Sequence, residues 1–469
     1  MNYYNRPTFD IQNPQKIFND ITVKPNLLSY FYLYLFSNSK YLNFSLFSKN
    51  IKSLSQKILS ISPQNNYDMY ISLSCIFGAF LGDSLGSHCE FMESSPTNHM
   101  KIYGNNRFSN GQVTDDSELA ISKAFAIMDM SDINKIDQNL LFYYYGIWTY
   151  SNPYDQGMTT STALNNFRIE SMPINDKNLF SNGIRQKIRN QNYNSKANGG
   201  LMRISTLIVW FYYKYKNEIR NCLNSNDKNR FLKLYTILFE EVKKDFEITH
   251  PNRENIVAGT LVAFMTLCTM NQFSGDETIT KLKILLESDL FNNHYSKEEI
   301  SLKSIIKKTL DDISYPQFQS FNYFKNVVTN MGLYTHAFKL ILYYLSVIDK
   351  RHLNEENIYI KIIQEICDYG GDTDTNAAIV GTVIGPLIGY LNFTRDKDRD
   401  KILFENLLNF YDKNRILYTS SFMFFFVEYL DKSFNRINNI YTNDLYSGNN
   451  YGIKFYVLEL LLNMFNKNI

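Results

Sequence analysis

The stretch Gly370-Gly371-Asp372-Thr373-Asp374-Thr375 leads directly into Asn376-Ala377-Ala378-Ile379-Val380-Gly381. The two glycines permit a tight backbone turn, and small residues then recur at positions 377, 381, 385 and 389. This spacing of four predicts a helix that can pack very closely against a neighbour. Asp372 and Asp374 would lie at the start of the helix, where the dipole favours anions. Because an N-cap uses only one aspartate, two at positions i and i+2 favour a bound cation.

Two other motifs begin in a similar way. An EF-hand loop also starts D-x-D-x-N, but it needs glycine at its sixth position and glutamate at its twelfth. This chain has Ala377 and Val383 at those positions, so the EF-hand interpretation fails. Phosphotransferases of the haloacid-dehalogenase type carry D-x-D-x-T/V at the end of a hydrophobic strand, whereas a helical pattern precedes Gly370 here. A cation-binding turn therefore remains the best interpretation.

Two further acidic stretches precede this one in the chain. Thr114-Asp115-Asp116-Ser117 stands before an apolar run, where threonine and aspartate are common N-caps. A cap explains one acidic residue, but the adjacent aspartates repel each other unless a cation lies between them. In Gly82-Asp83-Ser84-Leu85-Gly86-Ser87-His88-Cys89-Glu90, glycines recur every four residues from Gly78, which predicts a close helix crossing. Asp83 and Glu90 would share a helix face if the helix continued, although two surface carboxylates are the simpler interpretation.

Most of the chain is predicted to be helical. Apolar residues at three-to-four spacing predict helices over 120–130, 203–213, 231–242, 255–270, 338–345 and 358–367. Strand patterns are scarce, and polar breaks are expected at 181–200, 224–229, 292–299, 392–400 and 443–450. We expect a compact, orthogonal all-α bundle over 71–430, with 271–345 as an insertion or divergent segment. Residues 1–70 form an N-terminal extension, and residues 431–469 form a C-terminal helical extension packed on the domain.

Composition excludes several classes of protein. The 469-residue chain is 44% hydrophobic, and its net charge of +2 gives no sign of a nucleic-acid partner. Five widely spaced cysteines without a CxxC pair argue against a disulfide scaffold or a zinc site. No signal segment is visible, and the apolar runs at 27–36, 416–427 and 455–462 are shorter than the roughly 20 residues that span a membrane. We expect a soluble, cytoplasmic monomer.

Five segments, in this order, resemble the ADP-ribosylglycohydrolase family, which includes the dinitrogenase reductase-activating glycohydrolases. The family pattern runs GD-x₂-G-x₃-E, TDDT or SDDT, NG-x₂-MR, TH and GGDTDT. The corresponding segments here are 82–90, 114–117, 198–203, 249–250 and 370–375. Ser117 replaces the threonine of the second motif. The resemblance spans roughly residues 72–390.

The resemblance implies an all-α fold with two Mg²⁺ ions in a central cleft, and Mn²⁺ as the alternative ion. Carried over by position, the metal ligands are Thr114, Asp115, Asp116, Asp372, Asp374, Thr375 and Glu90, the last resembling a mobile glutamate of one branch. The implied substrate-contacting residues are Asp83, Asn198, Gly199, Gly200, Leu201 and His250. The implied catalytic set is Glu90 as acid/base group with Asp115, Asp116 and Asp374. From the residues alone, His250 before Pro251 is better explained as a helix-end or loop residue, and Arg203 as a structural ion pair.

The implied activity is Mg²⁺-dependent hydrolysis of the glycosidic bond between ADP-ribose and a serine or arginine side chain, or a related O- or N-linked acceptor. The partner would be an ADP-ribosylated protein or a small-molecule conjugate. Such a bond breaks through an oxocarbenium-like state, and Glu90 favours O-linked substrates by analogy with its branch. The alternative is a catalytically inactive, ADP-ribose-binding member of the family. Loss of metal ligands would be the signature of that alternative, and none is lost here.

Overall fold

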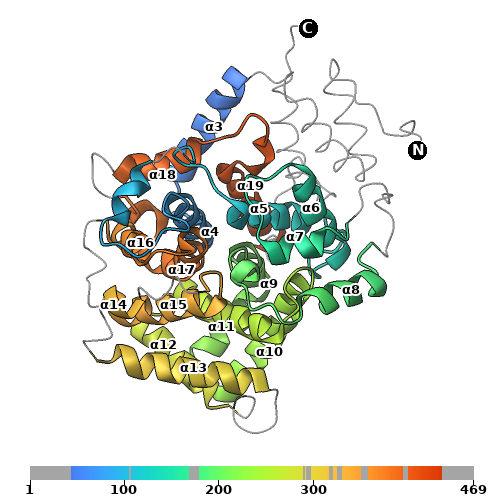
Figure 1. The fold of residues 1–469 in the computed structure, drawn as a ribbon, viewed down its shortest axis with the longest axis vertical. Helices are drawn as coiled ribbons and strands as arrows, with labels where there is room; N and C mark the ends of the chain where they lie inside the picture. Colours follow the sequence, from blue (N-terminus) through green and yellow to red (C-terminus); the bar gives the residue numbers. More distant parts are fainter. Residues whose placement is uncertain are drawn as a thin grey trace.

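The structure is a computed structural model of the chain. It describes residues 44–104, 107–167, 179–288, 291, 297–315, 321–324, 330–349, 357–394 and 400–435. These residues form α-helices joined by turns and short 3-10 segments (Figure 1). Within the described ranges, extended pairing is limited to two isolated bridges, Met92–Gly371 and Ala197–Leu333. The predicted all-α class is therefore confirmed.

Seventeen α-helices are described. They are α3 (Phe44–Leu59), α4 (Tyr67–Gly86), α5 (Asp115–Met128), α6 (Gln138–Tyr150), α7 (Met158–Leu164), α8 (Asn182–Asn192), α9 (Ser205–Leu223), α10 (Lys228–Phe246), α11 (Arg253–Met270), α12 (Gly275–Leu286), α13 (Lys297–Ile313), α14 (Phe321–Phe324), α15 (Tyr334–Ile348), α16 (Ile358–Tyr369), α17 (Thr373–Ile388), α18 (Asp400–Asn409) and α19 (Met423–Asn435).

The six segments with helical periodicity all lie in helices, and those at 120–130 and 203–213 overrun α5 and α9 by two residues. The predicted polar break at 181–200 is wrong in its first half, because α8 occupies residues 182–192. Most residues of α8 are polar, so the sequence lacks the apolar periodicity that predicts a helix. Helix α8 is held by tertiary ion pairs from Arg185 and Arg189 to Glu247, at 3.1 and 2.9 Å, rather than by a broad apolar face.

Helices α4 and α17 make the most extensive contact between two described helices (Figure 1). A Cβ on Gly82 would overlap the carbonyl group of Ala377, and a Cβ on Gly86 would lie 2.5 Å from the Thr373 carbonyl oxygen. A Cβ on Gly78 would likewise meet the backbone of Gly381. Both helices that were predicted to pack closely do so, and each is the partner of the other. The crossing brings the end of α4 to the beginning of α17.

Helix α4 is also the one described helix that is long and apolar enough to cross a membrane by length and composition. The whole apolar window of α4 is buried inside the fold, which is the environment of a core helix. The apolar run at 416–427 is buried in two 3-10 turns and the start of α19. The runs at 27–36 and 455–462 lie outside the described residues.

The described part of the N-terminal segment packs against the end of α18 and the turn that follows it. The Ser55 hydroxyl donates to the Leu408 carbonyl oxygen at 3.1 Å, and the Phe47 ring lies 4.7 Å from that of Tyr411. Helix α19 crosses the boundary that we expected at residue 430. All five cysteines are buried and free. The segments 1–43 and 436–469 lie outside the described residues.

Candidate functional site

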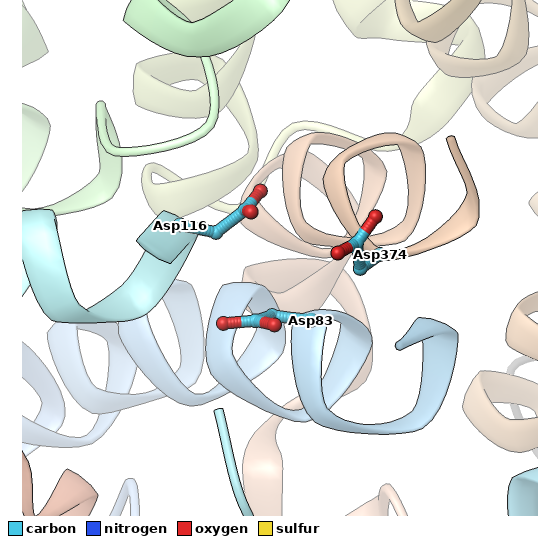
Figure 2. A group of neighbouring side chains, drawn as sticks. All are labelled: Asp83, Asp116 and Asp374. Atoms are coloured by element: carbon cyan, nitrogen blue, oxygen red, sulfur yellow. The ribbon is translucent and has the colours of Figure 1, made fainter. Parts of the chain in front are cut away.

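Three helix ends meet at one acidic cluster. Asp83 lies near the end of α4, Asp116 lies in the first turn of α5, and Asp374 lies in the first turn of α17. Figure 2 shows the three side chains approaching one another from these helices. One carboxylate oxygen from each lies within 4.8 Å of the others, and the same holds for the group formed by Glu90, Asp372 and Asp374. Asp374 belongs to both groups, so the two are continuous.

Asp83 anchors the turn that carries two of the other aspartates. Its Oδ1 accepts hydrogen bonds from Thr114 N at 3.1 Å and Thr114 Oγ1 at 2.8 Å. Its Oδ2 accepts from Ser117 N at 3.1 Å and Ser117 Oγ at 2.5 Å. These four donors leave the fully buried side chain little capacity for any other partner. The bonds fix the start of α5 and thereby the direction of Asp115 and Asp116.

The double-glycine turn ties Glu90 to the cluster. Gly370 and Gly371 have φ values of 75° and 80°, in the left-handed region that favours glycine. Gly371 N donates to Met92 O at 2.8 Å, and Phe91 N donates to Gly371 O at 2.7 Å. A Cβ on Gly370 would lie 2.5 Å from Met92 O. The predicted tight turn is confirmed, and it holds the segment after Glu90 against the start of α17.

Asp83 and Glu90 would share a helix face only if α4 continued to Glu90, and it does not; the simpler interpretation of two surface carboxylates is wrong, because both side chains are buried. Helix α4 ends at Gly86, where the Thr373 hydroxyl donates to the Gly86 carbonyl oxygen at 2.7 Å. The close crossing leaves that carbonyl facing α17. Glu90 lies beyond the helix, in the turn that leads to the bridge with Gly371. It reaches the acidic cluster through this tertiary contact, not through helical periodicity.

The cluster concentrates negative charge away from water. Burial raises the pKa of Asp115 to about 8 and that of Asp83 to about 6. Burial and then the neighbouring Asp155 carboxylate raise the pKa of Glu90 to about 8. The pKa values of Asp116 and Asp374 lie well above their usual range, because burial adds to the repulsion from nearby carboxylates. A cation among these groups would stabilise their ionised forms.

The side chains of the cluster fit a divalent cation. Asp116 Oδ2 lies 3.1 Å from Thr114 Oγ1, whose single hydrogen is directed to Asp83, and accepts from Thr375 Oγ1 at 3.4 Å. Asp116 Oδ1 is buried and has no hydrogen-bond partner among the described residues. An unpartnered buried carboxylate oxygen is costly. The oxygen atoms that could coordinate a metal here belong to carboxylate and hydroxyl groups, which are the ligands that hard cations such as Mg²⁺ prefer.

A cavity of about 240 Å³ opens beside the cluster. Eight of the thirteen predicted site residues line it: Glu90, Asp115, Asn198, Gly199, His250, Asp372, Asp374 and Thr375. The other five, Asp83, Thr114, Asp116, Gly200 and Leu201, lie outside its lining. Asp83 was predicted to contact substrate, but the structure places it behind the wall as the anchor of the Thr114–Ser117 turn.

The segment at 198–201 closes one side of the cavity. Asn198 Nδ2 donates to Asp372 Oδ2 at 2.7 Å, and Asn198 N donates to Gly332 O at 2.9 Å. Gly200 lies against the ring of Phe246, and Leu201 is fully buried. Asn198 and Gly199 therefore face the cavity, while the next two residues pack the wall from behind.

Comparison with known proteins decides the family. The family model described as ADP-ribosylglycohydrolase matches residues 71–405. The chain belongs to the ADP-ribosylglycohydrolase family. It is similar to a protein of Acanthamoeba polyphaga mimivirus named as an ADP-ribosyl glycohydrolase, with 28% identity over 340 residues that cover 69% of this chain and 88% of the relative. A solved structure titled ADP-ribosylglycohydrolase-related protein complex matches with a TM-score of 0.47 and 16% identity, over 76% of this chain and 99% of that one.

Two charged residues of this ADP-ribosylglycohydrolase site lie outside the five sequence motifs. Arg107 Nη1 lies 3.0 Å from Glu90 Oε2, and Arg107 Nη2 lies 3.4 Å from Asp155 Oδ2. Asp155 lines the cavity. Gly157 N donates to Asp115 Oδ2 at 3.3 Å, so the loop before α7 is tied to the cluster as well. The available sequence signal was the turn-forming run Asn152-Pro153-Tyr154-Asp155-Gln156-Gly157, which predicts a loop but not its neighbour.

Arg203, in contrast, has the structural role that its residue type suggested. It is fully buried, and its Nε lies 3.5 Å from Asp245 Oδ1. Lys123 Nζ lies 2.6 Å from Asp245 Oδ2, and the Tyr145 hydroxyl donates to Asp245 Oδ1 at 2.5 Å. This buried polar group stands behind His250, which does line the cavity.

Proposed function

We propose that this protein is a hydrolase that uses divalent cations to cleave the glycosidic bond between ADP-ribose and an acceptor. The acceptor would be a serine or arginine side chain, or a related O- or N-linked conjugate. The observation that carries the proposal is the pair of overlapping carboxylate groups around Asp374, beside a cavity that also has uncharged hydrogen-bonding residues in its wall. Family membership supports the same chemistry.

We infer that the cations are two Mg²⁺ ions, with Mn²⁺ as the alternative. The residues that would hold them are Glu90, Thr114, Asp115, Asp116, Asp372, Asp374 and Thr375. Bound Mg²⁺ supplies Lewis-acid stabilisation and orientation of ligand oxygens. Asp374 lies beside Asp116 and also beside Glu90 and Asp372, and its two oxygens can serve two neighbouring ions, while Asp83 stays bound to Thr114 and Ser117.

Glu90 is the group that we propose for proton transfer. It lines the cavity and is buried, and its pKa is raised to about 8. A carboxyl group beside the reacting atoms can take a proton from water and give one to a leaving oxygen. Arg107 holds the Glu90 carboxylate at the edge of the cavity.

The neutral side of the cavity would bind the rest of the ADP-ribose. Asn198 is fixed by its hydrogen bond to Asp372, and His250 stands next to Gly199. Burial lowers the pKa of His250 to about 3, so its ring is uncharged at neutral pH. Hydrogen-bond donors of this kind hold phosphate and hydroxyl oxygens and so orient the scissile bond toward Glu90.

The experiment is a release assay with peptides ADP-ribosylated on serine or on arginine, in Mg²⁺ or in EDTA. We expect free ADP-ribose to appear in Mg²⁺ only, and faster from the serine-linked peptide. The Asp374→Asn protein serves as the inactive control. Binding of ADP-ribose without release from either peptide would favour the inactive, ADP-ribose-binding alternative. Equal release in EDTA would overturn the metal dependence.

A further inference from the structure

A buried chain of hydrogen bonds ends on the ring of His250. Arg203 Nη2 donates to Thr249 Oγ1 at 2.8 Å, and Thr249 Oγ1 lies 2.8 Å from His250 Nδ1. Arg203 Nη1 also donates to Gly199 O at 3.1 Å. Thr249 and Arg203 are fully buried, and His250 is 1% exposed. The orientation of each hydrogen in this chain can therefore be worked out from the partners within it.

The direction of the Thr249–His250 bond follows from the donor inventory. A guanidinium group only donates, whereas a hydroxyl group has one hydrogen and two lone pairs. Arg203 occupies one lone pair of Thr249 Oγ1, and the partners of that oxygen in the described structure are Arg203 and His250. The acceptor for the Thr249 hydroxyl hydrogen is thus His250 Nδ1. A nitrogen that accepts carries no hydrogen, so the hydrogen of the neutral ring is on Nε2.

The opposite tautomer would leave a buried donor without an acceptor. With a hydrogen on Nδ1, Thr249 Oγ1 would accept twice and its own hydrogen would point to no partner. An unsatisfied buried donor shifts such an equilibrium by about ten-fold or more. The doubly protonated ring meets the same obstacle and also faces the positive charge of Arg203. Burial, followed by that charge, lowers the pKa of His250.

The Nε2 edge of the ring lies at the cavity wall. A Cβ on Gly199 would come within 2.7 Å of His250 Cε1 and 2.8 Å of His250 Nε2. Only glycine leaves room for the ring at this point, and both residues line the cavity. The N–H is therefore presented at the cavity wall beside the Asn198–Gly199 segment. Its partner must be an acceptor, such as a phosphate or hydroxyl oxygen.

We propose that His250 is an uncharged Nε2–H donor to an oxygen of the bound ADP-ribose, fixed in this tautomer by Thr249 and Arg203, and that it takes no part in proton transfer. The identification of the ligand as ADP-ribose rests on the proposed function, whereas the assignment of the tautomer does not. Thr249 is a positioning residue, because it acts on the ligand only through His250. Arg203 has the same role one bond further from the cavity.

The tautomer is tested by ¹⁵N NMR on the ligand-free protein with labelled histidine. The signals of His250 are those that disappear in His250→Gln. We expect an unprotonated Nδ1 and a protonated Nε2, unchanged between pH 8 and pH 5.5. A protonated Nδ1, or an imidazolium signal at pH 5.5, would overturn the proposal. Thr249→Ser should keep the wild-type signals, and Thr249→Val, which removes the hydrogen bond to Nδ1, should move the Nδ1 signal; identical spectra for Ser and Val would remove Thr249 from the proposal.

The donor role is tested by calorimetric titration with ADP-ribose. The amide nitrogen of glutamine can take the place of Nε2, whereas that of asparagine reaches only the place of Nδ1. We expect His250→Gln to bind within about three-fold of wild type and His250→Asn to bind about ten-fold more weakly. Equal affinities for the two variants would overturn the donor role. If the wild-type protein binds no ADP-ribose while the NMR spectrum shows Nε2–H, the proposed function fails and the tautomer stands.

Discussion

The hydroxyl group of Ser117 donates a 2.5 Å hydrogen bond to Asp83 Oδ2, which also accepts from the backbone N–H of the same serine. Ser117 is the position where this chain departs from the threonine of the family pattern. The structure shows that the position contributes a hydroxyl group, which serine and threonine both possess. The bond joins the end of α4 to the start of α5 and so sets the geometry of the acidic cluster.

Replacing Ser117 tests this joint. Ser117→Ala removes one of the donors to a buried carboxylate, a bond to a charged group worth about 1.5–3 kcal/mol. We expect lower stability and a smaller rise in Tm on adding Mg²⁺, whereas Ser117→Thr should match wild type. Thermal unfolding with and without Mg²⁺ measures both effects. Equal behaviour of the alanine and threonine variants would show that the hydroxyl group does not support the cluster.

Removing one carboxylate of the acidic cluster should abolish the stabilisation of the protein by Mg²⁺. Asp374→Asn, or Asp116→Asn, deletes a charge from a group whose members repel one another. In EDTA we expect these variants to be at least as stable as wild type, and in Mg²⁺ to show neither the Tm increase nor hydrolysis. Asp132→Asn, at a surface turn, is the matched control and should behave as wild type. Full activity of either site variant would refute the ligand assignment.

Glu90 should separate catalysis from binding. Glu90→Gln keeps the shape of the side chain but cannot exchange a proton, so we expect kcat to fall by about 10²–10⁴. Because the six other proposed ligands remain to hold the cations, the affinity for ADP-ribose should change far less. Glu93→Gln is the control, since Glu93 is an exposed carboxylate three residues away. A variant of Glu90 with normal turnover would exclude this residue from proton transfer.

The neutral, buried state of His250 predicts a pH dependence of stability. Its pKa is about 3 in the folded protein, below the ordinary value of 6.5. As pH falls from 6.5 toward 3, the unfolded chain therefore binds a proton that the folded chain does not, and the free energy of unfolding decreases. At pH 4.5 this amounts to about 2–3 kcal/mol. The carboxylates titrate in the same way in wild type and in His250→Gln, so their contribution cancels when the two proteins are compared. Between pH 7.5 and 4.5, the free energy of unfolding, measured with denaturant, should therefore fall more steeply in wild type than in His250→Gln. Parallel curves would contradict a buried neutral histidine.

The crossing of α4 and α17 should tolerate no added methyl group. Gly82→Ala would drive a Cβ into the backbone of Ala377, where no side chain can move aside. We expect a loss of at least about 3 kcal/mol, at the upper end of overpacking effects. Gly183→Ala is the control, because the nearest atom to its Cβ would be Ser181 Oγ at 3.9 Å. That change in α8 should stabilise the protein by up to about 1 kcal/mol. The free energy of unfolding in denaturant compares the two.

The sequence by itself determined the features that depend on neighbouring residues in the chain. Helical periodicity identified six helices, and the glycine spacing identified two close-packing faces. The turn at 370–375 was predictable because two adjacent glycines can adopt positive φ, as they do. The acidic motifs were likewise visible, because each one is a short run of residues whose chemistry does not depend on the rest of the fold.

Tertiary structure alone decided which residues meet and which way they face. It placed the glycine face of α4 against that of α17. Asp83, near the end of α4, lies behind the cavity wall, whereas Glu90, in the turn after α4, lines the cavity. Tertiary structure also recruited Arg107 and Asp155 and fixed the hydrogen of His250 through Thr249. The physical reason is that these relationships are set by helix crossings and hydrogen bonds between segments far apart in the chain, and no local pattern of residues encodes them.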